Sequence, residues 1–210
     1  MILTFASDKG GVGKSTACAA VATELARQGG NVFVFDLDPN RTIDSWVRRA
    51  RPAGITARSV NPSDFSAALL SEIKNHEHVL IDLAGFLDAA ILKAFKLSDL
   101  VVIPSGPSQP DLARVFNMVE TATVVGAACR VLFTRISPLT SRVALWSYEQ
   151  IEARGIARFT QVMIERAAYK EMFASGAAPY QSNKAAGAEV YALVHEIKQA
   201  VKALQKREAA

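Results

Sequence analysis

The chain has 210 residues, of which 50% are hydrophobic and 21% are charged, and its formal net charge at pH 7 is +4. This is an ordinary globular composition, without internal repeats or a low-complexity linker. No apolar run approaches the roughly 18 residues that a membrane-spanning helix needs, and no basic segment precedes the first apolar run as it does in a secretory leader. We therefore expect one globular domain, residues 1–210, in the cytoplasm.

A glycine-rich segment lies between a predicted buried strand, residues 2–6, and an alanine-rich predicted helix, residues 17–27. The segment is Lys9-Gly10-Gly11-Val12-Gly13-Lys14-Ser15-Thr16. It fits the phosphate-loop pattern Gly-x-x-x-x-Gly-Lys-Ser, except that Asp8 stands where the pattern has its first glycine. Glycines let backbone N–H groups converge on phosphate oxygens, and the following helix adds its partial positive charge. We predict that Lys14 reaches the terminal phosphates and that the Ser15 hydroxyl ligates Mg²⁺.

An additional early lysine, Lys9, makes this segment resemble the deviant Walker A motif of the ParA/MinD group of ATPases. The resemblance implies that residues 9–16 bind ATP and that Lys9 crosses to the partner subunit of an ATP-sandwiched homodimer. The physical reason is that two nucleotides buried face to face gather negative charge, and each needs a cation from outside its own loop. We therefore expect both Lys9 and Lys14 to serve catalysis as well as ATP binding.

The second predicted strand, residues 31–35, runs directly into Asp36-Leu37-Asp38-Pro39-Asn40. Aspartates at alternate positions point to the same face, here towards the phosphate loop if the strands are neighbours. A carboxylate near Mg²⁺ and the terminal phosphate can hold the attacking water, although these residues also suit an Asp-x-Asp-Pro turn. The segment resembles the Asp-x-Asp-Pro segment of the ParA family, which implies a catalytic role for Asp38 and a supporting role near the metal for Asp36.

Residues 41–58 are locally basic, with five arginines against Asp44 alone. We predict a short helix here that turns Trp46 and Val47 towards the core and leaves the arginines outside. The arginines are either an ordinary solvated helix face or a surface for DNA or a partner.

The third clear strand, residues 78–82, follows a predicted helix near residues 63–74 and ends in a single aspartate, Asp82. An apolar strand with an acidic residue at its carboxyl edge is a Walker B pattern, and beside a phosphate loop it predicts a metal role for Asp82. His76 and His78 precede the strand, and we interpret them as surface histidines rather than a metal pair.

Further strands are predicted at residues 100–104, 129–134 and near 159–164, and helices at 88–96, from 111 to about 125, 141–153 and 185–206. In ParA-like proteins the proline-rich loop after the fourth strand lies near the nucleotide and the dimer interface. Asp111 is therefore either part of that region or the N-cap of the next helix. The resemblance also brings the loop after residue 134 close to the adenine, which makes Arg135 a candidate nucleotide contact.

Seven basic residues against three glutamates lie between Arg130 and Lys170. Such a surface can hold DNA phosphates without reading sequence, but scattered solvated charges would give the same count. The candidate DNA contacts are Arg142, Arg158, Arg166 and Lys170.

Alternating strands and helices predict an α/β fold, a doubly wound, mainly parallel sheet with helices on both faces and the nucleotide at its carboxyl edge. The resemblance covers nearly the whole chain and is greatest for small ParA members that lack an N-terminal helix-turn-helix domain. It implies a Mg²⁺-dependent P-loop ATPase whose ATP-bound homodimer binds nonspecific DNA. Slow hydrolysis would be stimulated by a DNA-bound, ParB-like centromere-binding protein or a cargo adaptor, and the protein would partition plasmids or chromosomes, or position cargo, on the nucleoid.

Two other functions stay open. Dethiobiotin synthetase and cobyrinic acid amidases use a similar loop for phosphoryl transfer to a small metabolite, but this needs a substrate pocket that the sequence does not locate. MinD-like relatives bind membrane through a terminal amphipathic helix. Here the apolar stripe of residues 185–206 is interpreted as the face that docks on the sheet, so a membrane partner is not expected.

Overall fold

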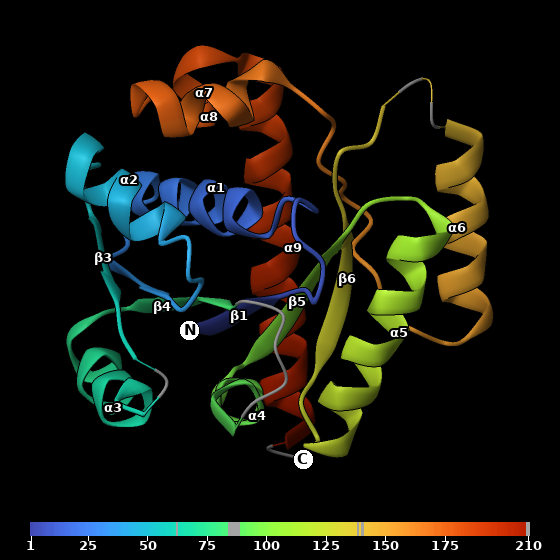
Figure 1. Ribbon diagram of the computed structural model, residues 1–210, viewed down its shortest axis with the longest axis horizontal. Coiled ribbons are helices and arrows are strands. Elements are labelled where there is room, and N and C mark those ends of the chain that lie inside the picture. The colour runs from blue at the N-terminus through green and yellow to red at the C-terminus, as the bar shows by residue number, and fades with distance from the viewer. Residues whose placement is uncertain (62, 84–88, 138, 140, 209–210) are drawn as a thin grey trace.

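A six-stranded sheet forms the centre of the computed structural model, which describes residues 1–61, 63–83, 89–137, 139 and 141–208. Its order is β3-β2-β4-β1-β5-β6, and every neighbouring pair is parallel (Figure 1). The strands are β1 (Ile2–Ala6), β2 (Val32–Asp36), β3 (Ile55–Ser59), β4 (His78–Leu83), β5 (Leu100–Ser105) and β6 (Cys129–Phe133). β2, β4 and β5 are buried along their whole length, as parallel strands covered on both faces are.

Helices cover both faces of this sheet, which confirms the predicted doubly wound fold. One apolar core joins the sheet to α1 (Lys14–Arg27), α2 (Thr42–Ala50), α7 (Ala167–Ser175) and α9 (Lys184–Glu208). The other joins it to α3 (Phe65–Asn75), α4 (Ala89–Leu97), α5 (Gln109–Val124) and α6 (Ser141–Ala153). Figure 1 shows α1 and α2 on one side of the sheet and α3 and α4 on the other, with the short α8 (Pro179–Ser182) beside α7.

The edge strand β3 is an element that the sequence prediction missed. It pairs in parallel with β2 from Ile55 to Ser59. Only Ile55 is buried, while Thr56 and Arg58 are exposed, so the segment lacks the continuous apolar run by which the other strands were recognised.

The predicted strand near residues 159–164 is wrong. This segment lies beside β6 but makes only isolated bridges, between Val131 and Arg158 and between Ile136 and Ile164. Side chains of α9 replace part of the missing ladder, because the Glu196 carboxylate accepts hydrogen bonds from the N–H groups of Thr160 and Gln161 at 2.8 and 3.0 Å. These two backbone N–H groups therefore have hydrogen-bond acceptors although the segment is not a regular strand.

Other differences from the sequence prediction are local. α1 begins at Lys14, three residues earlier than expected, and residue 88, where the fourth helix was expected to begin, lies outside the described residues.

His78 is buried and only 6% exposed, against the turn at Gly30, so its interpretation as a surface histidine is wrong. The apolar side of α9 packs into the core as predicted, and no helix among the described residues is long and apolar enough to cross a membrane.

Candidate functional site

The predicted phosphate loop joins the carboxyl end of β1 to the first residue of α1, Lys14. Gly11 and Gly13 adopt the left-handed backbone conformation, with φ of 79° and 87°, which glycine adopts without strain. Gly13 immediately precedes α1, so the loop closes directly onto a helix N-terminus, where backbone N–H groups and the helix dipole favour an anion.

A cavity of about 480 Å³ opens in front of this loop. Most of the loop lines one side of it, and three further segments complete its wall. These segments contribute Asp38, Asn40 and Thr42, then Thr134 and Arg135, and then Met163, Ile164, Glu165, Arg166, Tyr169, Lys170 and Phe173. The volume is in the range of small-molecule and cofactor sites.

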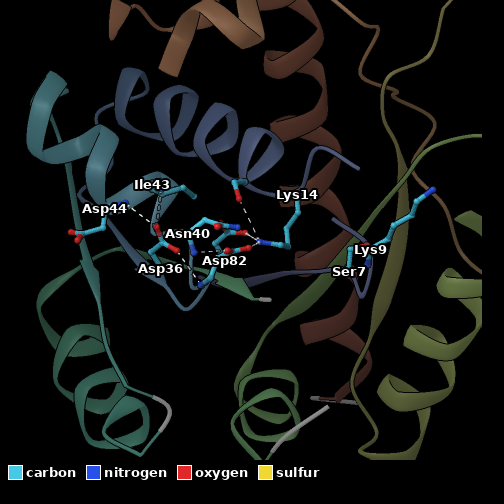
Figure 2. Close-up of polar contacts among 10 residues, drawn as sticks. Ser7, Lys9, Lys14, Asp36, Asn40, Ile43, Asp44 and Asp82 are labelled. Carbon is cyan, nitrogen blue, oxygen red and sulfur yellow. Dashed lines mark hydrogen bonds and ion pairs between the residues drawn. The ribbon is translucent and has the colours of Figure 1, made fainter. Parts of the chain in front are cut away.

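The ammonium group of Lys14 lies at the centre of the predicted catalytic residues (Figure 2). Its Nζ is 2.7 Å from Asp82 Oδ1, 3.1 Å from Asp38 Oδ2 and 3.4 Å from Ser15 Oγ. Burial disfavours the charged form of Lys14, but the two carboxylates outweigh it and raise the pKa of Lys14. The structure thus brings together four of the residues that the sequence assigned to phosphate binding, metal binding and hydrolysis.

The oxygen atoms around Lys14 fit the donor set that Mg²⁺ prefers. Asp82 is fully buried, and its Oδ2 atom has no hydrogen-bond partner among the described residues. With the Ser15 hydroxyl it offers hard oxygen ligands at one point. The described residues contain no group of three His, Cys, Asp or Glu side chains that could hold a metal ion.

Asp38 closes the turn that follows β2. Its Oδ1 atom accepts a hydrogen bond from the Asn40 N–H at 2.9 Å while its Oδ2 atom contacts Lys14. Burial opposes ionisation, but the Asn40 N–H and Lys14 outweigh it and lower the pKa of Asp38. The carboxylate is therefore charged at neutral pH and is partly open to the cavity.

Asp36 instead faces the start of α2. Its Oδ2 atom accepts the N–H groups of Ile43 and Asp44 at 2.8 and 2.9 Å, and its Oδ1 atom accepts the Asp38 N–H at 3.1 Å. The carboxylate thus takes the place of an N-cap, because Arg41 at the N-cap position makes no side-chain cap hydrogen bond. Its supporting role near the metal stays a prediction, and burial raises its pKa.

Two reciprocal ion pairs tie the start of the phosphate loop to the first turns of α5. Lys9 Nζ lies 2.5 Å from Asp111 Oδ1, and Arg114 lies 3.3 Å from Asp8 Oδ2. Figure 2 shows Lys9 directed away from the cluster around Lys14. Burial opposes ionisation of Asp111, but the hydrogen bonds from Lys9 and Ser108 prevail and lower its pKa.

Asp111 is not the N-cap of α5, as one interpretation had it. Ser108 is the N-cap, and Asp111 occupies the third helical position, where its carboxylate accepts the Ser108 N–H in a capping box. The other interpretation, a position near the nucleotide and the dimer interface, stays a prediction; the contact with Lys9 places Asp111 beside the phosphate loop.

Residues 3–207 match the model of the CobQ/CobB/MinD/ParA nucleotide-binding domain. The chain belongs to this family. It is 32% identical over 190 residues to the protein ParA of Rhizobium radiobacter, an alignment that covers 83% of each chain. It is also 29% identical over 111 residues to protein VirC1 of the same organism, covering 50% of this chain and 48% of VirC1.

Solved structures show the same fold. A putative plasmid partition protein from Borrelia burgdorferi B31 bound to AMPPNP has a TM-score of 0.73 at 18% identity, with 99% of this chain and 98% of that one covered. MinD from Aquifex aeolicus has a TM-score of 0.76 at 17% identity, with 94% and 97% covered. The predicted ParA/MinD membership and P-loop fold class are therefore confirmed, which makes the protein a nucleotide-binding P-loop protein of the ParA/MinD type.

Arg135 lies in this ParA/MinD site at the edge of the phosphate loop. It has a left-handed backbone, with φ of 56°, and its guanidinium donates to the Gly11 carbonyl at 2.9 Å. This places the side chain beside the loop and on the cavity wall, and its contact with the nucleotide stays a prediction.

The four candidate DNA contacts are mostly held by acidic neighbours. Arg158 pairs with Glu152 at 2.7 Å, Lys170 with Glu165 at 3.3 Å, and Arg166 with Glu189. Arg142 lies apart from them on α6 and is exposed. They do not form one surface of unpaired cations in this structure, and their role in DNA binding stays a prediction.

Sequence reasoning missed Thr134, Asn40 and Thr42 as residues of the cavity wall. The Thr134 hydroxyl donates to the Val12 carbonyl at 2.5 Å and so fixes the phosphate loop against the end of β6. A usable signal was present, because Thr134 stands at the carboxyl end of a predicted strand, the edge at which ligands bind in parallel sheets.

Proposed function

We propose that the protein is an ATP-dependent switch of the ParA type, which dimerises on ATP, holds DNA without sequence preference, and hydrolyses ATP slowly until a DNA-bound partner protein stimulates it. The observation that carries this proposal is the convergence of Lys14, Ser15, Asp38 and Asp82 in front of the phosphate loop. The 32% identity to a protein named ParA and the structural likeness to a plasmid partition protein support DNA partition as the process served. As part of this proposal, the protein acts in the cytoplasm, and on the nucleoid when ATP is bound.

Each residue of the site has a separate role in hydrolysis, which its position determines. Lys14 leaves its carboxylate partners and binds the terminal phosphates, and Ser15 and Asp82 would hold Mg²⁺. A Mg²⁺ ion bound there would supply positive charge against the phosphate oxygens. Asp38, which is charged and faces the cavity, orients the attacking water and accepts its proton. Catalysis of this kind rests on positioning and charge.

The proposal is tested by measuring binding of the purified protein to arbitrary duplex DNA with AMPPNP, with ADP and without nucleotide, at two salt concentrations. Binding that requires AMPPNP and weakens with salt is the expected result, because phosphate contacts release counterions. A protein that binds ATP but no DNA in any state would contradict the DNA-holding switch and favour a membrane, a protein scaffold or a metabolite as the partner.

Lys9 is expected to be required for dimerisation but not for ATP binding by the monomer. Replacing Lys9 with Ala removes a cation that we place on the partner's nucleotide, and losing one member of a buried charge pair at an interface costs at least about 2 kcal/mol, or roughly 30-fold in affinity. Sedimentation with AMPPNP measures the dimer, and Lys202→Ala on the exposed side of α9 is the charge-matched control. An unchanged dimer in Lys9→Ala would contradict a role in trans.

Asp111→Asn is expected to strengthen the AMPPNP-dependent dimer, whereas Lys9→Ala is expected to weaken it. Because Asp111 holds Lys9 within its own subunit, removing the carboxylate charge frees Lys9 for the partner and tightens the AMPPNP-dependent dimer about two- to fivefold. Ser108→Ala is the matched control, since it weakens the same capping box while keeping the carboxylate. Equal dimer affinities for Asp111→Asn and Ser108→Ala would show that the ion pair does not compete with dimerisation.

A further inference from the structure

The exposed side of α2 carries a row of arginines that the proposed site does not use. This α2 stripe consists of Arg41, Arg48, Arg49 and Arg51. Arg48 and Arg49 are exposed residues of the last turn of α2. Arg41 and Arg51 are the exposed residues that flank the helix at its N-cap and C-cap, both with left-handed backbones. The opposite side is anchored by Ile43, Trp46 and Val47, all in the core. The stripe therefore faces solvent on a firmly packed helix.

Most of the charge on this stripe is not neutralised by the protein. Arg48 pairs with Asp44 at 3.0 Å, and Arg49 donates to a neutral acceptor, the Phe173 carbonyl of α7. The side chains of Arg41 and Arg51 make no hydrogen bond or ion pair with any described residue. In this respect the stripe differs from Arg158, Arg166 and Lys170, each of which has a glutamate partner.

The stripe is also coupled by contact to the nucleotide site. One carboxylate, that of Asp36, accepts the N–H groups of Ile43 and Asp44 at the start of α2 and the N–H of Asp38 in the catalytic turn. Arg41 belongs to that same turn, because its N–H donates to the Asp38 carbonyl at 2.9 Å. A movement of Asp38 on nucleotide binding therefore reaches the first turn of α2 directly.

We propose that the α2 stripe is the surface that holds the phosphates of duplex DNA. This rests on the nonspecific DNA binding of the proposed function and locates it. Seven residues of helix span about 10 Å, and duplex DNA carries one charge per roughly 1.7 Å of its axis, so one stripe faces several phosphates. An anionic membrane fits less well, because the large apolar side chains of α2, Ile43, Trp46 and Val47, are all buried and none of them is available to enter lipid.

The test compares two variants that each lower the formal net charge from +4 to +2. The first is Arg49→Gln with Arg51→Asn, which leaves the Arg48–Asp44 pair intact and puts at position 51, where φ is 47°, a residue that tolerates this conformation. The control is Lys202→Gln with Lys206→Gln, on exposed positions of α9. DNA affinity is measured with AMPPNP over a range of salt concentrations.

The α2 variant is expected to bind DNA about tenfold more weakly at physiological salt. The slope of log affinity against log salt should fall by about 1.8 for each subunit in contact, because each lost phosphate contact removes roughly 0.9. The α9 control should keep the wild-type slope. Should the double variant fold poorly, Arg51→Asn alone is expected to lower the slope by roughly 0.9 per subunit in contact.

Equal slopes for wild type, the α2 variant and the α9 control would overturn the α2 assignment while leaving DNA binding itself intact. No DNA binding by wild-type protein in any nucleotide state would instead overturn the proposed function, so the two failures are distinguishable. Vesicles that contain anionic lipid provide the remaining comparison. Loss of vesicle binding by the α2 variant with unchanged DNA binding would assign the stripe to a membrane and overturn the inference.

Discussion

Replacing Lys14 with Met is expected to abolish measurable ATP binding and to lower the free energy of unfolding by about 3–5 kcal/mol. Lys14 is the lysine that we propose binds the phosphates, and it is also the partner of a fully buried carboxylate, Asp82, at 2.7 Å. Removing it leaves that carboxylate without a compensating charge in the interior of the sheet edge. Nucleotide titration calorimetry measures the first effect and chemical denaturation measures the second.

The double variant Lys14→Met with Asp82→Asn separates these two effects. Removing both charges eliminates the uncompensated carboxylate, so we expect most of the lost stability to return. ATP binding should stay absent, because the lysine is still missing. A Lys14→Met protein as stable as wild type would contradict the explanation, since it would mean that Asp82 is not a buried charge that depends on Lys14.

The fold was predictable where burial imposes a simple pattern. Strands such as β4 and β5 are buried on both faces, so their sequences are continuous apolar runs. β3 was missed because an edge strand needs only partial burial and therefore lacks a continuous apolar run. It also contains Arg58, so it was interpreted as part of a basic segment. Residues 159–164 have the apolar content of a strand, yet Glu196 satisfies two of their N–H groups from 35 and 36 residues away. A contact of that range leaves no local sequence signal.

The candidate site was predictable to a similar degree. The carboxyl-edge rule places Lys14, Ser15 and Asp82 together once the strands are ordered, and the structure agrees. The pairing of Lys9 with Asp111, across 102 residues, depends on how α5 begins and could not be derived from spacing. Asp36 was expected to point to the same face as Asp38, towards the phosphate loop, and its supporting role near the metal came from the resemblance. Its carboxylate instead accepts the N–H groups of Ile43 and Asp44, which alternation along a strand could not predict.

The position of Lys14 suggests an order of events in the site. Its ammonium group lies among Asp38, Asp82 and Ser15, the oxygen donors that we assign to Mg²⁺ and water. One positive charge therefore satisfies both carboxylates before nucleotide arrives. If Lys14 turns to the phosphates, as the proposed function requires, both carboxylates become available together. Phosphate binding, metal binding and the release of Asp38 would then be linked through one side chain.

Asp38→Asn is the variant that tests this linkage at the chemical step. We expect ATP affinity within a few-fold of wild type, because Lys14, the proposed phosphate contact, is unchanged and Asn can still accept the Asn40 N–H that closes the turn. Hydrolysis should fall by about 10²–10⁴-fold, the usual contribution of a positioned general base. Single-turnover phosphate release with excess protein measures the chemical step directly, and it does so without the stimulating partner.

The matched control is Asp64→Asn, on an exposed aspartate that makes no cap hydrogen bond at the start of α3. It applies the same chemical change far from the cavity and should leave hydrolysis unchanged. Normal phosphate release in Asp38→Asn would remove this carboxylate from the mechanism and leave positioning of the water to the metal and the backbone. Slow release with intact AMPPNP-dependent dimerisation would show that Asp38 acts in the chemical step, after the switch has assembled.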